Sequence, residues 1–157
     1  MLVGIALKLG LAPFHMWIPD VYQGAPTPIT TYIATVSKAA LVALLLRFAT
    51  EVGVLELPSV VHLFSLLAVV SMVTGNVLAL LQQNVKRLLA YSSIAHFGYV
   101  LVALLAGGPP AAEAVTFYVI VYCAMSLGAF GVVTVYSSES GDKNRVEDYQ
   151  GLFWTRP

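Results

Sequence analysis

The sequence predicts an all-α integral membrane protein, and both its composition and its apolar runs support this fold class. Hydrophobic residues make up 59% of the 157 residues, whereas charged residues make up only 10%. Soluble domains usually carry about 25% charged residues, and burial in a soluble core does not explain this deficit. The five apolar runs are each close to the ~20 residues with which a helix crosses a membrane. They are continuous, whereas the strands of a membrane barrel would alternate.

Five membrane-spanning helices are expected from these runs. We expect them at about residues 1–18, 28–48, 59–81, 85–106 and 111–136. Turn-forming or polar residues separate them at residues 20–28, 51–58, 82–84 and 107–110. Residues 1–137 therefore form the predicted transmembrane bundle. Residues 138–157 are polar, and we expect them to form a cytoplasmic loop that leads to a further helix beyond this chain.

The first helix contains a proline between two titratable residues, Lys8 and His15. Pro13 removes one helical hydrogen bond and clashes with the preceding turn, so we expect the helix to break near this residue. Broken helices expose backbone groups to a cavity in many transporters. Lys8 and His15 are seven residues apart, a spacing that puts both on one side of a regular helix. His15 is a candidate proton relay; the competing interpretation is that it caps the freed backbone.

The second helix contains a lysine, Lys38, close to its centre. An ammonium group at a helix centre costs at least ~2.5–3.5 kcal/mol on insertion scales, and a lysine avoids this cost by giving up its proton. Lys8 and Lys38 are therefore candidate proton carriers. The alternative is that each lysine snorkels to the interface or pairs statically. Helical spacing places Thr31 and Thr35 on the face of Lys38, where they could hold water or merely satisfy backbone carbonyls.

The fourth helix carries a polar stripe, and the fifth carries small residues. Ser92, His96 and Tyr99 share one face of the fourth helix, with Ser93 beside them. Such a stripe suits a hydrogen-bonded water chain, although a lone satisfied histidine would look similar. The fifth helix is expected to serve packing, with the hydroxyl groups of Tyr118 and Tyr122 as additional polar groups; its small-residue stripe is Ala124, Gly128 and Gly131. His62, near the start of the third helix, is interpreted as structural.

Lys and Arg placement predicts how the helices are oriented. If the helices alternate in direction, one side of the membrane holds only Arg47. The other side holds Lys86, Arg87, Lys143, Arg145 and Arg156. This five-to-one bias places the second side in the cytoplasm, by the positive-inside rule.

Several function classes find no support in the sequence. The net charge is zero, and no basic patch predicts nucleic-acid binding. The single cysteine, Cys123, cannot form an internal disulfide and lies in an apolar run. We find no phosphate-binding loop or dinucleotide fingerprint, and no cluster with metal-ligand spacing. We therefore expect no metal, no bound cofactor and no redox chemistry in this chain.

Two motifs resemble the antiporter-like subunits of the proton-pumping NADH:quinone oxidoreductase, respiratory complex I. The first runs from Lys8 to Pro28, and its segment "VYQGAPTP" is similar to the N-type branch of that family. The second runs from Asn84 to Tyr99, and the closing residues 151–157 fit the same branch. The resemblance covers the whole chain, and its first motif is highly specific.

The resemblance implies a 14-helix fold with two inverted five-helix repeats, of which this chain would supply helices seven to eleven. The residue matching Lys8 would be the pumping lysine of a broken helix, Lys38 the central-axis lysine and His15 a connecting relay. The acidic partner of the first lysine lies upstream in the family, and the terminal lysine of the path lies downstream. Neither has a counterpart here, so the chain would hold the central part of a proton path.

The expected function is proton translocation across the membrane, coupled to quinone reduction elsewhere in the complex. The complex as a whole would use NADH and quinone, and it would lie in the bacterial inner membrane. The partners would be lipid and the neighbouring membrane-arm subunits. Three alternatives stay open: a subunit of a multisubunit sodium/proton antiporter, a related complex with another electron donor, and a non-pumping membrane scaffold.

Overall fold

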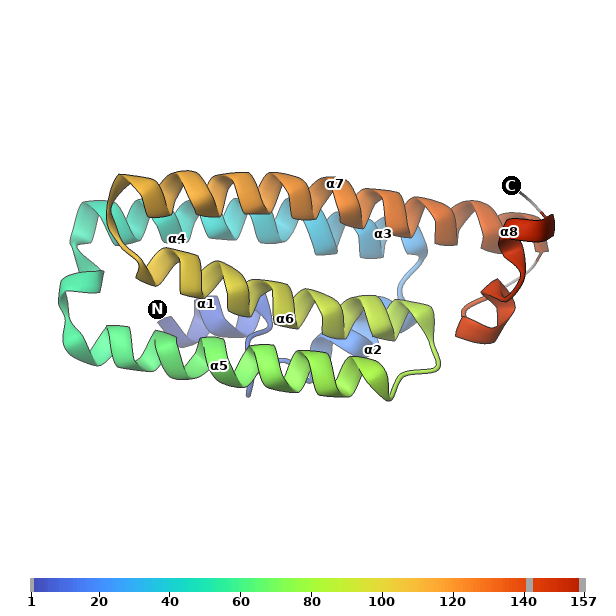
Figure 1. Ribbon diagram of the computed structural model, residues 1–157, viewed down its shortest axis with the longest axis horizontal. Helices are drawn as coiled ribbons and strands as arrows, with labels where there is room; N and C mark the ends of the chain where they lie inside the picture. The colour runs from blue at the N-terminus through green and yellow to red at the C-terminus, as the bar shows by residue number, and fades with distance from the viewer. Residues whose placement is uncertain (1, 141–142, 156–157) are drawn as a thin grey trace.

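A computed structural model describes residues 2–140 and 143–155, and these residues fold into an elongated bundle of helices (Figure 1). Four helical segments are long and apolar enough to cross a membrane: Thr27–Val52, Pro58–Leu80, Val85–Leu105 and Gly108–Ser137. No strand forms in the described residues, where one isolated bridge joins Asn84 to Arg145. The all-α membrane fold class predicted from the sequence is thus confirmed.

The first apolar run is two short helices rather than one continuous helix. Helix α1 spans Leu2–Leu9 and helix α2 spans Trp17–Gly24, with non-helical residues between them. Gly10 has φ +76°, a left-handed conformation that glycine adopts at little cost. Pro13 follows and has no backbone N–H to continue a helix. The break predicted near Pro13 is therefore confirmed.

The second membrane span contains a π-helical turn just before Lys38. Helix α3 (Thr27–Tyr32), the π turn η1 (Ile33–Ser37) and helix α4 (Lys38–Val52) follow one another without interruption. A π turn accommodates one more residue than an α turn, and such insertions are frequent at functional sites. The π turn changes the register between Thr31 and Lys38, so the regular α-helical spacing expected from the sequence does not hold there.

The third and fourth spans pack closely against each other. Helix α5 spans Pro58–Leu80 and helix α6 spans Val85–Leu105, and they lie side by side (Figure 1). Gly75 permits this approach, because a Cβ atom there would lie 2.6 Å from the backbone nitrogen of Ala95. Both helices lie within one or two residues of the ranges expected from the sequence.

The fifth span is longer than the expected range of 111–136. Helix α7 spans Gly108–Ser140 and includes Pro109 and Pro110 in its first turn. The difference has a simple cause, because proline is tolerated in the first turn, where its missing N–H would have no helical partner.

The C-terminal segment forms two short helical pieces, η3 (Val146–Tyr149) and α8 (Leu152–Thr155). It returns to the turn between α5 and α6, where the backbone N–H of Val85 donates to the carbonyl of Asn144 at 2.8 Å. The bundle interior is apolar, but it also buries polar side chains. These are His15, Thr27, Thr30, Thr35, Lys38, Ser71, Lys86, Ser93 and Ser126.

Candidate functional site

Lys38 is the most deeply buried charged residue among those described, and it defines the candidate site. Only 2% of its surface is exposed. Its Nζ atom donates a hydrogen bond to Ser93 Oγ at 2.8 Å and lies 4.7 Å from the centroid of the Phe97 ring. A second ring, that of Tyr22, has its centroid 5.8 Å from the same atom. Within the described ranges, no carboxylate lies within ion-pair distance of Lys38.

Helix α6 supplies both main contacts of Lys38. Ser93 and Phe97 are four residues apart and therefore lie on one face of this helix, which is turned toward α4. Ser93 Oγ also donates to the carbonyl of Ala90 at 2.9 Å. The sequence had favoured Ser92 with Ser93 only beside it, because spacing alone does not show which face of α6 meets α4.

A cavity of about 280 Å³, lined by both polar and apolar side chains, lies beside Ser93. Helices α6 and α7 line it with Leu89, Ser92, Ser93, His96, Tyr122, Met125, Ser126, Ala129 and Phe130. Three serines, one histidine and one tyrosine offer the polar partners that buried water requires, and the volume is sufficient for several water molecules. Ser93 therefore connects the amine of Lys38 to a space that can hold water.

His96 joins this cavity to α7. A hydrogen bond of 2.6 Å links His96 Nδ1 to the hydroxyl group of Tyr118. The rings of Tyr99 and Tyr122 lie 6.1 Å and 5.3 Å from the His96 ring, centroid to centroid. Tyr99 is partly exposed and accepts a hydrogen bond from Asn76 Nδ2 at 3.2 Å. Tyr118 thus takes part in a polar contact, although the sequence favoured a packing role for α7.

The broken helix places Lys8 and His15 in different surroundings. Lys8 lies in the last turn of α1 and is exposed on the surface of the described chain. His15 is 8% exposed, and within the described chain neither ring nitrogen has a hydrogen-bond partner of ordinary geometry. Its ring centroid lies 6.3 Å from that of Tyr91. Because residues 10–14 between Lys8 and His15 are not helical, the expected two-turn register does not relate the two side chains.

The two threonines of the second span bond to their own backbone. Thr31 Oγ1 donates to the carbonyl of Thr27, and Thr35 Oγ1 donates to the carbonyl of Thr31, each at 2.7 Å. No hydrogen bond joins either hydroxyl group to Lys38 among the contacts of the described residues. The structure thus places Ser93, and not this pair, in contact with the lysine.

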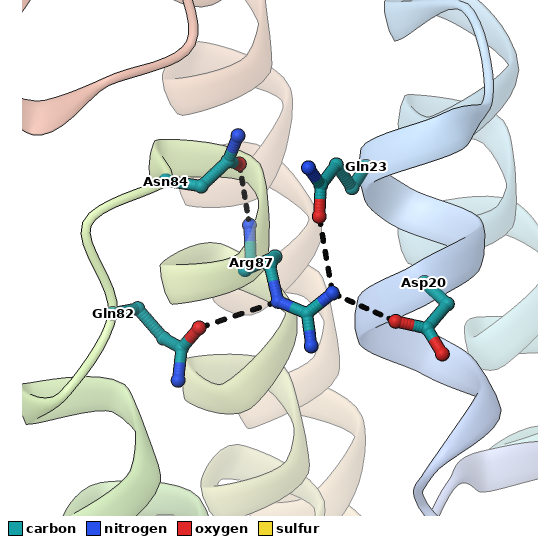
Figure 2. A network of polar contacts seen from close by, with 5 residues as sticks. All are labelled: Asp20, Gln23, Gln82, Asn84 and Arg87. Atoms are coloured by element: carbon teal, nitrogen blue, oxygen red, sulfur yellow. Dashed lines mark hydrogen bonds and ion pairs between the residues drawn. The ribbon is translucent and has the colours of Figure 1, made fainter.

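A network around Arg87 ties α2 to the start of α6 (Figure 2). Arg87 Nη1 donates to Asp20 Oδ1 at 2.7 Å and to Gln23 Oε1 at 3.0 Å. Its Nε atom donates to Gln82 Oε1 at 3.3 Å, while the Asn84 side chain caps α6 by accepting from the Arg87 backbone N–H. The sequence used Arg87 only for orientation, since no local pattern reveals an ion pair between residues so far apart.

Lys86, next to Arg87, is also buried, and it makes a longer hydrogen bond at the end of α2. Its Nζ atom donates to the carbonyl of Ala25 at 3.4 Å, just beyond the C-terminal end of α2. A cation there interacts favourably with the negative end of the helix dipole. The two adjacent cations therefore hold both the side and the end of α2.

In the described part of the chain, no group of three or more His, Cys, Asp or Glu residues is placed to hold a metal ion. The candidate site itself offers an amine, hydroxyl groups and an imidazole. Such groups accept and donate protons.

The whole chain, residues 1–157, matches the family described as "NADH:quinone oxidoreductase/Mrp antiporter, TM". A relative from Psychrobacter arcticus, named NADH-quinone oxidoreductase subunit N, is 51% identical over 160 residues, which are 100% of this chain and 32% of the relative. A relative with the same name from Ectopseudomonas mendocina is 52% identical over 164 residues, again 100% of this chain and 32% of the relative.

Two solved structures share the fold. A chain of respiratory complex I from Thermus thermophilus is 44% identical with a TM-score of 0.82, covering 99% of this chain and 33% of that chain. A chain of the archaeal membrane-bound sulfane sulfur reductase is 27% identical with a TM-score of 0.81, covering 94% and 30%. The chain therefore spans about a third of the length of the proteins it matches.

Proposed function

Because the chain belongs to the NADH:quinone oxidoreductase/Mrp antiporter transmembrane family, we propose that it is the central part of a subunit N that translocates protons in a membrane-bound NADH:quinone oxidoreductase. Relatives about half identical to it over its full length bear the name of that subunit. The whole protein would work in the bacterial inner membrane, beside lipid and the neighbouring membrane-arm subunits. NADH and quinone would react elsewhere in the complex.

The observation that carries this proposal is the environment of Lys38. A lysine that is 2% exposed has no carboxylate within ion-pair distance among the described residues, and its amine bonds to a serine that lines a cavity together with other hydroxyl groups and a histidine. A static ion pair would require a fixed counter-ion. A proton carrier requires instead a partner through which the proton can leave, and Ser93 provides that partner.

The proposed path has an inner part and an outer part. In the inner part, the Ser93 hydroxyl accepts a proton from Lys38, turns from the Ala90 carbonyl and gives its own proton to water in the cavity. His96 with its bonded Tyr118 continues the path. In the outer part, Lys8 accepts or releases a proton at the broken helix, and His15 relays it toward Lys38. The exposed position of Lys8 suits a partner on a segment outside this chain.

A charge shift driven by quinone reduction would supply the energy. Moving a carboxylate toward or away from Lys8 changes the proton affinity of that lysine, and a change of one pKa unit corresponds to about 1.4 kcal/mol. The described residues hold the two lysines in separate surroundings, so each can respond to a different neighbouring charge.

Replacement of Lys38 by alanine in the full-length, assembled complex tests this function. In proteoliposomes, we expect Lys38→Ala to lose the contribution of this subunit to protons pumped per electron. Arg47→Ala is the matched control, because Arg47 lies on the same helix with a side chain that is 74% exposed. Equal pumping in Lys38→Ala and the wild type would refute the proposed role.

A sodium/proton antiporter subunit is the second candidate, because the family that matches the chain includes Mrp antiporters. The likeness to a chain of the archaeal sulfane sulfur reductase likewise keeps a respiratory complex with another redox reaction open. Purification of the native protein with its partners separates these candidates. Co-purification with NADH:quinone reductase activity supports the first proposal, whereas sodium/proton exchange without redox activity supports the second.

A non-pumping scaffold is separated by Lys38→Arg. A guanidinium group stays protonated, so a structural cation would be preserved, whereas proton exchange would stop. Loss of pumping in an assembled Lys38→Arg complex is therefore the expected result.

A further inference from the structure

The middle of helix α5 buries a hydroxyl group that reaches the broken helix. Ser71 is completely buried, and its Oγ atom accepts a hydrogen bond of 2.9 Å from the backbone N–H of Ala12. The two residues are 59 positions apart in the sequence. The expectations drawn from the sequence placed no functional residue in this part of α5.

The Ala12 N–H depends on this serine because the break removes its helical partner. Around it, Gly10 and Leu11 donate to carbonyls of α1, and Phe14 donates to the carbonyl of Leu11. Pro13 has no N–H. In the hydrocarbon region of a membrane, water is not available as a partner for an unpaired backbone N–H. The Ser71 hydroxyl group therefore completes the hydrogen bonding of the break.

Two further contacts hold the break in one shape. The indole Nε1 of Trp17 donates to the carbonyl of Leu7 at 2.9 Å. Ile18 packs so closely over Gly10 that a Cβ atom at this glycine would lie 1.6 Å from Ile18 Cδ1. These contacts join α2 to α1, whereas the bond from Ala12 to Ser71 joins the break to a third helix.

We propose that Ser71 is a positioning residue of the proton path, an inference that rests on the function proposed above. Ala12 lies four residues after Lys8 and three before His15. The anchor at Ala12 therefore fixes the segment that sets the separation and direction of these two groups. Ser71 does not carry the proton; it acts through the backbone of the break.

The test compares Ser71→Ala with Ser71→Thr in the full-length assembled complex. Thr keeps a hydroxyl acceptor, and Ala removes it. Ser65→Ala is the matched control, because Ser65 lies on the same helix, is exposed and donates only to the carbonyl of Val61 one turn earlier. Two quantities are measured in each variant: hydrogen exchange of the segment around Ala12, and protons pumped per electron.

We expect Ser71→Ala to speed hydrogen exchange around Ala12 by about tenfold, the effect of losing one hydrogen bond, and to lower pumping per electron. Ser71→Thr and Ser65→Ala should match the wild type in both measurements. If Ser71→Ala does not assemble, Ser71→Cys takes its place, because a thiol is a weaker acceptor of similar size, and it should show the same two changes to a smaller degree.

Each contrary outcome overturns a distinct statement. Unchanged exchange in the variant without the hydroxyl group would show that Ser71 does not anchor the break. Faster exchange with unchanged pumping would show that the anchor does not position the path. Failure of the proposed function itself would be seen in Lys38→Ala, which leaves Ser71 in place, so the two failures are distinguishable.

Discussion

Removal of the Ser93 hydroxyl group tests the connection between the buried lysine and the cavity. In Ser93→Ala, Lys38 loses the hydroxyl that accepts its hydrogen bond at 2.8 Å. A hydrogen bond to a charged group contributes about 1.5–3 kcal/mol. At 1.4 kcal/mol per factor of ten, the loss changes the equilibrium between the connected and the unconnected lysine by about tenfold to a hundredfold. Proton transfer from Lys38 to the cavity should fall by a similar factor.

The assay is proton uptake per electron by the full-length complex in proteoliposomes. Ser93→Ala should lower this ratio while quinone reduction by the uncoupled complex continues. Ser92→Ala should lower it less, because Ser92 lines the same cavity without a bond to Lys38. Ser93→Thr, which keeps the hydroxyl group, should recover most of the loss. An unchanged ratio in Ser93→Ala would refute the connection through this residue.

Three further predictions follow from individual contacts. Tyr118→Phe removes the 2.6 Å hydrogen bond to His96, worth about 1 kcal/mol, and should slow proton pumping about fivefold or less in the same assay. Arg87→Ala removes two side-chain bonds to α2 and one to Gln82 in the turn before α6. It should lower the free energy of unfolding by about 1–2 kcal/mol, whereas Arg47→Ala should lower it by less than about 0.5 kcal/mol; thermal melting of the purified complex measures both. Gly75→Val places atoms against the backbone of α6 and should cost about 1–3 kcal/mol, seen as a lower yield of assembled complex; an unchanged melting temperature in Arg87→Ala, or a normal yield in Gly75→Val, would contradict the packing described.

Local chemistry made the fold class and the helix break predictable. Lipid requires long apolar helices, so the four long spans could be found from composition and length alone. The first run, expected as one helix over residues 1–18, is instead divided into α1 and α2, and α2 continues to Gly24. Pro13 lacks the N–H that a continuous helix needs, so the break could be placed from one residue. Lys38 stood out because a charge near the centre of an apolar helix is costly wherever the helix packs.

The residues that contact Lys38 could not be predicted from the local sequence. The π turn at Ile33–Ser37 alters the register before Lys38, and no residue in it carries a distinctive signal. The choice between Ser92 and Ser93 depends on which face of α6 meets α4, a result of packing among several helices. Ser71 is likewise one serine among many in the sequence, and its contact with Ala12 exists only because α5 passes the break.

The central claim is that Lys38 gains and loses a proton during turnover, and infrared difference spectroscopy of the assembled complex tests it most directly. With isotope-labelled lysine, the complex should show an ammonium band that appears and disappears as quinone is reduced, and Lys38→Ala should lack the part of this change that comes from Lys38, while the part from Lys8 remains. A lysine spectrum that stays constant through turnover, or a change of the same size in Lys38→Ala and the wild type, would contradict the account.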